Sequence, residues 1–429
     1  MAAAERLALV ATCASGLEEI LDGELDALGV MARERQRGAV RFAGGWRDCW
    51  RANWRLRTAN RVLIELASWP AADGAALAAG MRALAAGRTS GRTARQTAAR
   101  TAGATAGEDG AAAAAALAVE SAAPDLDLAA LLHPDRSFAI QATAAASRIR
   151  DTRWAALSAK DGLVDGQRDR WGRRADVDRE SPELQLRLRL HRDRATLLLD
   201  TAGEPLDRRG YRVLSTTAPV RETLAAACVL AAGWDGRGAV VDPMCGSGTL
   251  LVEAGWVALG IPPGQLRQAR QPEEGGTAWA FERLPGFDPA AFAEVRAELL
   301  PMPGPGVRLV GNDRSAEALR AARANLECAG LQQRAQLTRG EAADCRPPAG
   351  RGLSPGLVVI NPPYGERAAT DAGHWRELGS LLKHHFQGWR AAVLAGGEGL
   401  GKHIGLRPRR RLPVKNGPLD ARILIFDLF

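Results

Sequence analysis

No stretch of the 429-residue sequence reaches the roughly 18 consecutive apolar residues that a membrane-spanning helix requires. The beginning, MAAAERLALVATCASGLEEILDGEL, lacks the basic segment of a secretory signal and soon becomes acidic. The six cysteines show no CxxC pair and no other metal-binding spacing, so we expect free thiols in a reducing compartment and no metal site. These absences predict a cytoplasmic protein without a membrane partner.

Lysine is scarce, and the basic residues are mostly arginine. Only Lys160, Lys383, Lys402 and Lys415 occur among the 57 basic residues, which exceed the 49 acidic residues by 8. This excess favours a polyanionic partner only weakly, because a GC-rich genome alone produces many Arg and Ala codons. The proportions of hydrophobic (46%) and charged (25%) residues are those of a folded globular protein.

Large apolar side chains are also scarce in one internal segment, from about residue 85 to 120. It includes the run RTSGRTARQTAARTAGATAGEDGAAAAAALA. A segment of this composition cannot bury much surface, so we interpret it as an insertion that forms a loop, a solvated helix or a disordered stretch.

Both sides of the insertion show α/β patterns. Residues 15–29 have apolar side chains at helical spacing, with Ser15 as the predicted cap and Gly29 at the end. A second helix is predicted over residues 154–172. The predicted strands, the last two of which form a hairpin, are 39–44, 60–67, 137–143, 183–193 and 194–203.

From residue 239 short apolar strands alternate with helices, which is typical of a doubly wound, mostly parallel sheet. Asn416 and Gly417 lie between two strand-like runs near the end, so a closing antiparallel hairpin is expected there. We expect this region, from about residue 215 to 429, to fold by itself.

Two strand ends in this region carry carboxylates. Asp242 ends the first strand and is followed by a loop in which Gly246 and Gly248 let a ligand approach the backbone. Asp313 ends the next strand, where it could accept the ribose hydroxyls of a nucleoside or cap the helix that begins at Ser315. Because the loop reads GSG and not GxGxxG, a nucleoside without phosphates fits better than a dinucleotide, and a nicotinamide dehydrogenase is excluded.

The sequence INPPYG, residues 360–365, places a rigid corner after another buried strand. The Asn361 side-chain oxygen and the Pro362 carbonyl could hold both N–H groups of an aromatic amine, and Tyr364 could stack on its ring. Pro362 and Pro363 fix φ and remove two backbone donors, which leaves a surface of acceptors. The simpler alternative is a loop corner with a turn asparagine.

DPMCGSGT together with NPPYGER resembles the class I S-adenosyl-L-methionine-dependent amino-methyltransferases. Further blocks, such as WAALSAKDGLVDG and LDTAGEPLDRRGYR, are similar in kind and order to the THUMP-domain 23S rRNA guanine-N2 methyltransferases. The resemblance covers nearly the whole chain outside the insertion. It implies a stand-alone counterpart of the N-terminal half of a fused two-methyltransferase protein.

The resemblance implies three α/β domains. These are a ferredoxin-like region (1–70), a THUMP RNA-binding domain (71–212) and a Rossmann-like methyltransferase domain (213–429) whose mostly parallel sheet ends in an antiparallel hairpin. S-adenosyl-L-methionine would lie against Asp242, Gly246 and Gly248, with Asp313 at its ribose. The residue that faces the adenine amine would be Glu341, where the family mostly has aspartate. Asn361, Pro362, Pro363 and Tyr364 match the catalytic motif of the family.

The implied partner is 23S rRNA or a large-subunit precursor. Residues 142–212 contain 16 Lys and Arg against 12 Asp and Glu, so we expect phosphate contacts there. The candidates are Lys160, Arg173, Arg174, Arg208 and Arg209. Two alternatives are a methyltransferase for tRNA guanine-N2 or adenine-N6, because the same motif serves both amines, and a non-catalytic RNA-binding assembly factor. The intact Asn361, Tyr364 and Asp313 argue against the second.

Deletion of about residues 90–118 should leave folding and activity nearly unchanged, because the segment has too few apolar groups to join a core. Thermal unfolding and methylation rates of the shortened and full chains test this expectation. A large drop in either quantity would contradict it.

Overall fold

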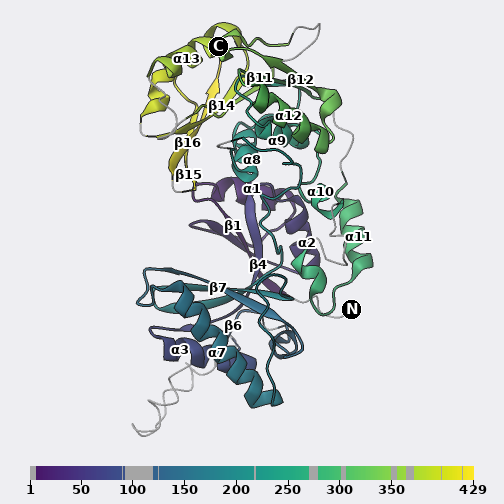
Figure 1. Cartoon of the computed structure of the whole chain (residues 1–429), viewed down its shortest axis with the longest axis vertical. Helices are drawn as coiled ribbons and strands as arrows, with labels where there is room; N and C mark the ends of the chain where they lie inside the picture. The colour runs from purple at the N-terminus through teal and green to yellow at the C-terminus, as the bar shows by residue number, and fades with distance from the viewer. Residues whose placement is uncertain are drawn as a thin grey trace.

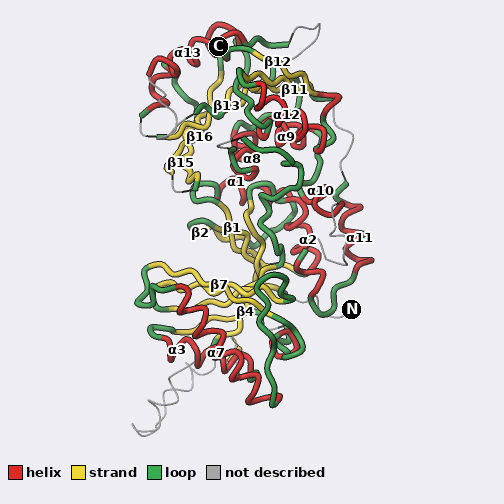
Figure 2. Tube along the Cα trace, viewed as in Figure 1, coloured by secondary structure: helices red, strands yellow, loops and turns green. Residues whose placement is uncertain are grey.

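The computed structural model describes residues 6–88, 90–91, 119–123, 125–216, 219–269, 279–300, 306–348, 355–363, 372–397, 399–417 and 419–429. Within these residues the strands form a nine-stranded sheet in the first half of the chain and a seven-stranded sheet in the second. Figure 1 shows the two sheets following each other along the long axis, and Figure 2 shows the helices that flank them. No helix in this part of the chain is long and apolar enough to span a membrane.

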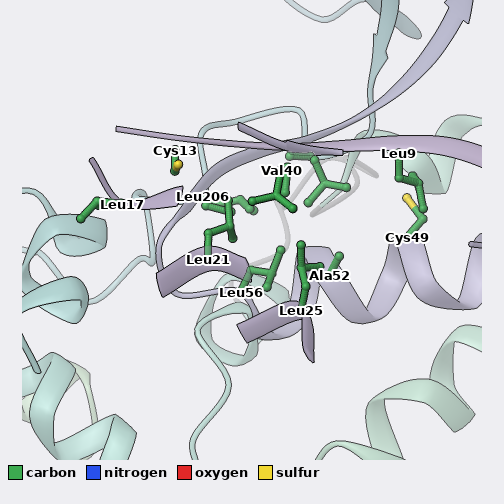
Figure 3. Packing of buried hydrophobic residues seen from close by; sticks show 14 of the residues in the cluster. Leu9, Cys13, Leu17, Leu21, Leu25, Val40, Cys49, Ala52, Leu56 and Leu206 are labelled. Atoms are coloured by element: carbon green, nitrogen blue, oxygen red, sulfur yellow. The ribbon is translucent and has the colours of Figure 1, made fainter. Parts of the chain in front are cut away.

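The nine-stranded sheet begins with an antiparallel unit in the order β2-β3-β1-β4. Its elements are β1 (Leu7–Cys13), α1 (Glu18–Ala27), β2 (Arg33–Gln36), β3 (Ala39–Gly44), α2 (Trp46–Arg55) and β4 (Ala59–Pro70). Figure 3 shows buried side chains of the two helices, among them Leu21, Leu25 and Ala52, gathered beneath Val40 and Leu9 of the sheet. This arrangement is the predicted ferredoxin-like unit.

The predicted end of α1 is confirmed, and its predicted cap is wrong. Gly29 has φ +79°, and the helix ends there as expected. Leu17 occupies the N-cap position and makes no side-chain cap hydrogen bond. The carbonyl oxygen of Ser15 instead accepts a hydrogen bond from the Lys415 amide at 3.2 Å. Ser15 therefore belongs to a contact with the C-terminal hairpin, which sequence spacing could not reveal.

Strand β4 is shared by two units of the sheet. It pairs with β1 from Ala59 to Ile64 and with β9 from Leu63 to Pro70, and its register with β9 shifts between Glu65 and Ala67. The sheet continues through β9 (Arg194–Asp200), β8 (Leu184–His191) and β7 (Phe138–Ala145). The predicted boundary after residue 70 thus falls at the end of a strand that belongs to both units.

Within the described residues, this second unit also contains the helices α3 (Gly74–Ala85), α6 (Leu128–Leu131) and α7 (Thr152–Trp171). The predicted β8–β9 hairpin is confirmed, and its turn residues Arg192 and Asp193 have φ +50° and +56°. Most of the predicted insertion lies outside the described residues. Its described flanks, β5 (Ser90–Gly91) and β6 (Glu120–Ser121), pair with each other, so a deletion limited to 92–118 preserves that pair.

The seven-stranded sheet has the order β12-β11-β10-β13-β14-β16-β15. All neighbouring strands are parallel except β16, which runs antiparallel to β14 and β15. The strands are β10 (Ala239–Asp242), β11 (Arg308–Asp313), β12 (Ala335–Arg339), β13 (Leu357–Ile360), β14 (Arg390–Gly396), β15 (Arg410–Asn416) and β16 (Leu419–Asp427). The predicted parallel sheet and closing hairpin are confirmed. The strand order reverses between β10 and β13, where such sheets bind ligands.

The connecting helices are α8 (Glu222–Ala231), α9 (Thr249–Ala258), α12 (Ala316–Cys328) and α13 (Ala372–His385). Strands β10 and β13 are buried along their whole length, as expected for a sheet covered on both faces. Between α9 and β11 the chain forms an arm of α10 (Gly264–Ala269), the 3-10 turn η1 (Ala280–Arg283) and α11 (Pro289–Glu298). Figure 1 shows this arm beside α2.

An aromatic cluster joins α2 to the arm. Trp54 of α2 lies with its ring centroid 6.4 Å from that of Trp279 and 6.2 Å from that of Phe292. Trp50 contacts Phe292 edge-on at 5.8 Å, and Arg47 forms ion pairs with Glu294 and Glu298 at the rim. The two halves of the molecule therefore share an apolar core.

A buried ion pair lies beside this core. Arg209 is only 2% exposed, and its Nε donates to Glu253 Oε1 at 3.3 Å. Its other nitrogens donate to the carbonyl oxygens of Leu206 and Arg57. This placement corrects the prediction that Arg209 contacts RNA, because a buried guanidinium with internal partners cannot reach a phosphate.

These contacts argue against a self-folding fragment that starts at residue 215. Such a cut removes Arg209 and Tyr211, which both bond Glu253, and it exposes the arm's face of the aromatic cluster.

Trp54→Ala should destabilise the full chain by about 3–5 kcal/mol, because it leaves a cavity in the shared core where the side chain is 3% exposed. Trp154→Ala provides the matched control, since Trp154 is 47% exposed and should cost about 1 kcal/mol or less. Urea unfolding of the three proteins measures both values. Equal decreases in the free energy of unfolding would show that the contact between α2 and the arm stabilises the protein no more than an exposed tryptophan does.

Candidate active site

A cavity of about 800 Å³ opens at the carboxyl ends of β10, β11 and β13. It is the place where the strand order reverses, so parallel strands deliver their last residues to one point. Among its lining residues are six that the sequence singled out: Asp242, Gly246, Asp313, Glu341, Asn361 and Pro363.

The two loop glycines have different roles. Gly246 has φ +50° and lines the cavity, and a Cβ there would meet nothing within 4 Å, so the backbone conformation alone favours glycine. Gly248 has φ +80° and directly precedes α9, where a Cβ would lie 3.2 Å from the Ala322 side chain. It is not among the described residues that line the cavity, so close packing against α12 explains it better than ligand contact.

Asp313 connects the glycine loop to the second strand. Its Oδ2 accepts a hydrogen bond from the Gly246 amide at 3.0 Å, and its Oδ1 accepts one from the Ser315 amide at 2.9 Å. The cap of α12 is Ser315, whose hydroxyl accepts from the Ala318 amide at 3.2 Å. Asp313 is therefore not the helix cap. It holds the loop and faces the cavity.

Asn312 is a site residue that the sequence reasoning missed. Its side-chain amide donates to the carbonyl oxygens of Pro243, Gly340 and Glu341 at 3.0–3.3 Å. One buried side chain thus ties the loop after β10 to the loop after β12. An asparagine directly before the strand-end aspartate was the available signal.

Asp242 has an incomplete set of partners. The residue is 1% exposed, its Oδ1 accepts from the Met244 amide at 3.0 Å, and its buried Oδ2 has no hydrogen-bond partner among the described residues. Burial, and to a lesser degree the charge of Asp313, raises the pKa of Asp242 to about 8. A cationic group placed at Oδ2 would satisfy the oxygen and favour its ionised form.

Asn361, at the end of the neighbouring strand, also has an incomplete set of hydrogen-bond partners. It directly follows β13, and its buried Oδ1 has no partner within the described part of the chain. Pro363 is exposed and lines the cavity, whereas Pro362 is buried and is not among the described lining residues. Tyr364 lies outside the described residues. The corner therefore combines a cavity-lining residue with a buried acceptor that has no partner among the described residues.

Helix α13 supplies a wall of the cavity that the sequence reasoning did not assign. His374, Glu377, Leu378 and Leu381 line it. The predicted helix there was a sufficient signal, because the helix that follows a strand in such a sheet packs beside the strand's carboxyl end.

The remaining predicted RNA contacts are at least partly exposed, and none is among the described residues that line the cavity. Lys160 pairs with Asp161, Arg173 with Asp135 and Arg208 with Glu204, and Arg174 is exposed. A group that was not predicted lies at the beginning of α7, where Arg148 is 77% and Trp154 47% exposed. Arg150 and Arg153 of the same stretch are also exposed.

Three family profiles match successive parts of the chain. They are described as "RlmL ferredoxin-like domain" at residues 8–63, "THUMP domain" at 114–200 and "RMKL-like, methyltransferase domain" at 209–425.

Curated relatives include "Ribosomal RNA large subunit methyltransferase K/L" of Syntrophotalea carbinolica, 36% identical over 97% of this chain and 53% of the relative. The protein of that name in Allochromatium vinosum is 34% identical over 96% of this chain and 50% of the relative. The chain spans about half the length of these relatives.

Solved structures share the fold over the whole chain. SMU.472 in complex with SAH has a TM-score of 0.77 at 24% identity, covering 100% of this chain and 99% of its own. A protein of Listeria monocytogenes, named as a predicted N6-adenine-specific DNA methylase, has a TM-score of 0.75 at 25% identity, covering 99% and 97%.

The raised pKa of Asp242 predicts a pH-dependent stability of the ligand-free protein. Its folded value of about 8 exceeds the roughly 3.9 of an unfolded chain, so the folded protein holds a proton that the unfolded chain releases. The resulting stabilisation is complete below about pH 4 and is lost as the pH rises through 8. Relative to Asp242→Asn, the wild type should lose up to about 1.4 kcal/mol per pH unit in this window.

Thermal unfolding of both proteins between about pH 5 and pH 8 checks this expectation. Asp420→Asn is the control, because the Asp420 side chain is 81% exposed and should leave the pH profile unchanged. Parallel profiles of the wild type and Asp242→Asn would contradict the assignment.

Proposed function

Since the chain belongs to the RMKL-like methyltransferase family, we propose that it transfers a methyl group from S-adenosyl-L-methionine to the N2 amine of a guanine in 23S rRNA. The names of the curated relatives support large-subunit rRNA as substrate. The observation that carries the proposal is that Asp242 and Asn361, which line one cavity, each have a buried oxygen without a hydrogen-bond partner among the described residues.

The cavity residues fit the methyl donor. Asp313 would hold the ribose, the Gly246 turn leaves room for the backbone to approach the ligand, and Glu341 lies on the loop that would face the adenine. The unsatisfied Asp242 Oδ2 suits the α-ammonium group at the amino-acid end of the cofactor. When bound, this cofactor supplies a methyl group on a cationic sulfur.

The Asn361 corner would orient the nucleophile. The amine lone pair of guanine is delocalised into the ring, and two acceptors that bind both N–H groups turn the lone pair toward the electrophile. The Asn361 Oδ1 and the Pro362 carbonyl would be these acceptors, and Tyr364 would stack on the base. Because the acceptors sit on a rigid double-proline turn, little reorganisation accompanies the reaction.

The N-terminal half would bind the RNA. Arg150, Arg153 and Trp154 combine exposed positive charge with an exposed ring, which suits phosphate contact and base stacking. Arg148 is also exposed and shares its charge with Asp193 at 3.2 Å. The sequence-predicted Lys160, Arg173, Arg174 and Arg208 would contribute further charge, although three of them share it with a carboxylate.

The second candidate is methylation of adenine N6, or of guanine N2 in tRNA. The same acceptor corner can hold either amine, and the name of the structurally similar Listeria protein refers to adenine. A non-catalytic assembly factor is disfavoured, because such a protein has no need for two buried, unsatisfied acceptors on residues that line one cavity.

Asn361→Ala should reduce turnover by roughly 10²–10³ and leave S-adenosyl-L-methionine affinity within a few-fold, because one transition-state contact is lost and the donor contacts remain. Single-turnover methylation of 23S rRNA and calorimetry with the donor measure the two effects. Mass spectrometry of digested nucleosides should find N2-methylguanine. Near-normal turnover of the variant would refute the catalytic role, and N6-methyladenine alone would favour the second candidate.

A further inference from the structure

The C-terminal part of the chain carries a one-sided charge that the cavity does not use. Residues 400–416 contain six Lys and Arg and no Asp or Glu. Two of the four lysines of the chain lie here, and a third, Lys383, lies in the neighbouring helix α13. A genome bias toward arginine does not explain this concentration of lysine.

The strand register places part of this charge on one face. Arg411 is opposite Leu424, Pro413 opposite Arg422 and Lys415 opposite Asp420, and residues opposite each other share a face of the sheet. Leu424 lies beneath the 3-10 turn η4 (Leu400–Ile404), since a Cβ on Gly401 would meet its Cδ1 at 2.6 Å. Arg411, Lys415 and Arg422 therefore emerge on the side of η4.

Two more cations lie on this side. Lys402 is exposed on η4, and the exposed Lys383 has its Nζ 3.5 Å from the Cβ position of Gly405, directly after η4. We define the C-terminal basic surface as Lys383, Lys402, Arg411, Lys415 and Arg422. Asp420, which pairs with Lys415 at 2.7 Å, is the only acidic residue of β15 and β16 on this face. Figure 1 shows its elements on one side of the upper half of the molecule, with α13 at the top and β15 lower, near α1.

The surface is level with the catalytic corner. Ile360, which precedes Asn361, pairs with Val393, Val393 pairs with Leu424, and Leu424 pairs with Arg411. Three strand spacings separate the first and last members of this row, or roughly 14 Å. Lys415 and Arg422 lie further toward the edge that carries the cavity. One strand of nucleic acid could reach both places.

We propose that the C-terminal basic surface binds the RNA phosphates next to the target nucleotide. The inference rests on the proposed function and deepens it, because it assigns RNA contacts to the catalytic half in addition to the N-terminal half. Charge complementarity favours RNA over a protein partner. On β15 and β16 the exposed large apolar side chains within the described residues are limited to Leu419, whereas protein interfaces need an apolar centre.

The test compares two double variants with the same change in charge. Arg411→Gln/Arg422→Gln removes two cations from the surface. Arg237→Gln/Arg334→Gln removes two exposed cations that precede β10 and β12, at the opposite edge of the sheet. Binding of protein-free 23S rRNA to the full-length chain is measured over a series of salt concentrations, with donor binding as the check on folding.

The slope of log K against log salt should fall by about 1.4–1.8 in the first variant, which corresponds to 0.7–0.9 for each of two phosphates, and stay unchanged in the second. Arg411→Lys/Arg422→Lys should retain the slope. Equal slopes for the wild type and both Gln variants would overturn the proposal. It would also be overturned if the Gln substitutions in the surface weakened binding of an acidic protein and left RNA binding unchanged. If the first Gln variant loses donor binding, Lys402→Gln replaces it, with an expected decrease of about 0.7–0.9.

The proposed function fails differently. Suppose that the wild type binds 23S rRNA with a salt slope that depends on Arg411 and Arg422, but methylates no guanine. This result would refute the proposed reaction and would still support RNA binding by the C-terminal basic surface.

Discussion

The position of one half of this molecule relative to the other depends on a buried carboxylate. Glu253 is inaccessible to solvent and accepts hydrogen bonds from Arg209 and Tyr211, which both lie on the segment that joins the two sheets. A buried ion pair adds little net stability, but loss of one partner leaves an uncompensated buried charge. The joining segment must therefore keep the conformation that places Arg209 against Glu253. The aromatic cluster around Trp54 provides a second contact between the two halves.

Because of this junction, the cavity keeps a fixed position relative to the N-terminal sheet. The N-terminal sheet, with its exposed cations, and the cavity with Asp242 and Asn361 cannot rotate freely about a linker, because α2, the arm and the β15 hairpin contact across the junction. Under the proposed function, a bound RNA would have to bring its target base to this fixed cavity. Such preorganisation reduces the entropy lost when the amine is positioned.

Local sequence patterns were sufficient to predict features that neighbouring segments or the regular order of strands determine. Asn416-Gly417 gave the closing hairpin, and the strand ends at Asp242 and Asp313 converge because parallel strands deliver their carboxyl ends to one edge. Features that depend on distant segments were missed. Nothing in the sequence around Arg209 separates a buried arginine from a solvated one, and the role of Gly248 depends on Ala322, more than 70 residues away. Asn312 was overlooked because its three acceptors come from two other loops.

The strand that belongs to both N-terminal units has a consequence for how they come apart. β4 supplies hydrogen bonds to β1 along one part of its length and to β9 along the other, with a register shift between Glu65 and Ala67. Withdrawing this strand would leave open edges in both units at once. We therefore expect the ferredoxin-like and THUMP parts, which are two modules in sequence, to unfold together as one cooperative unit.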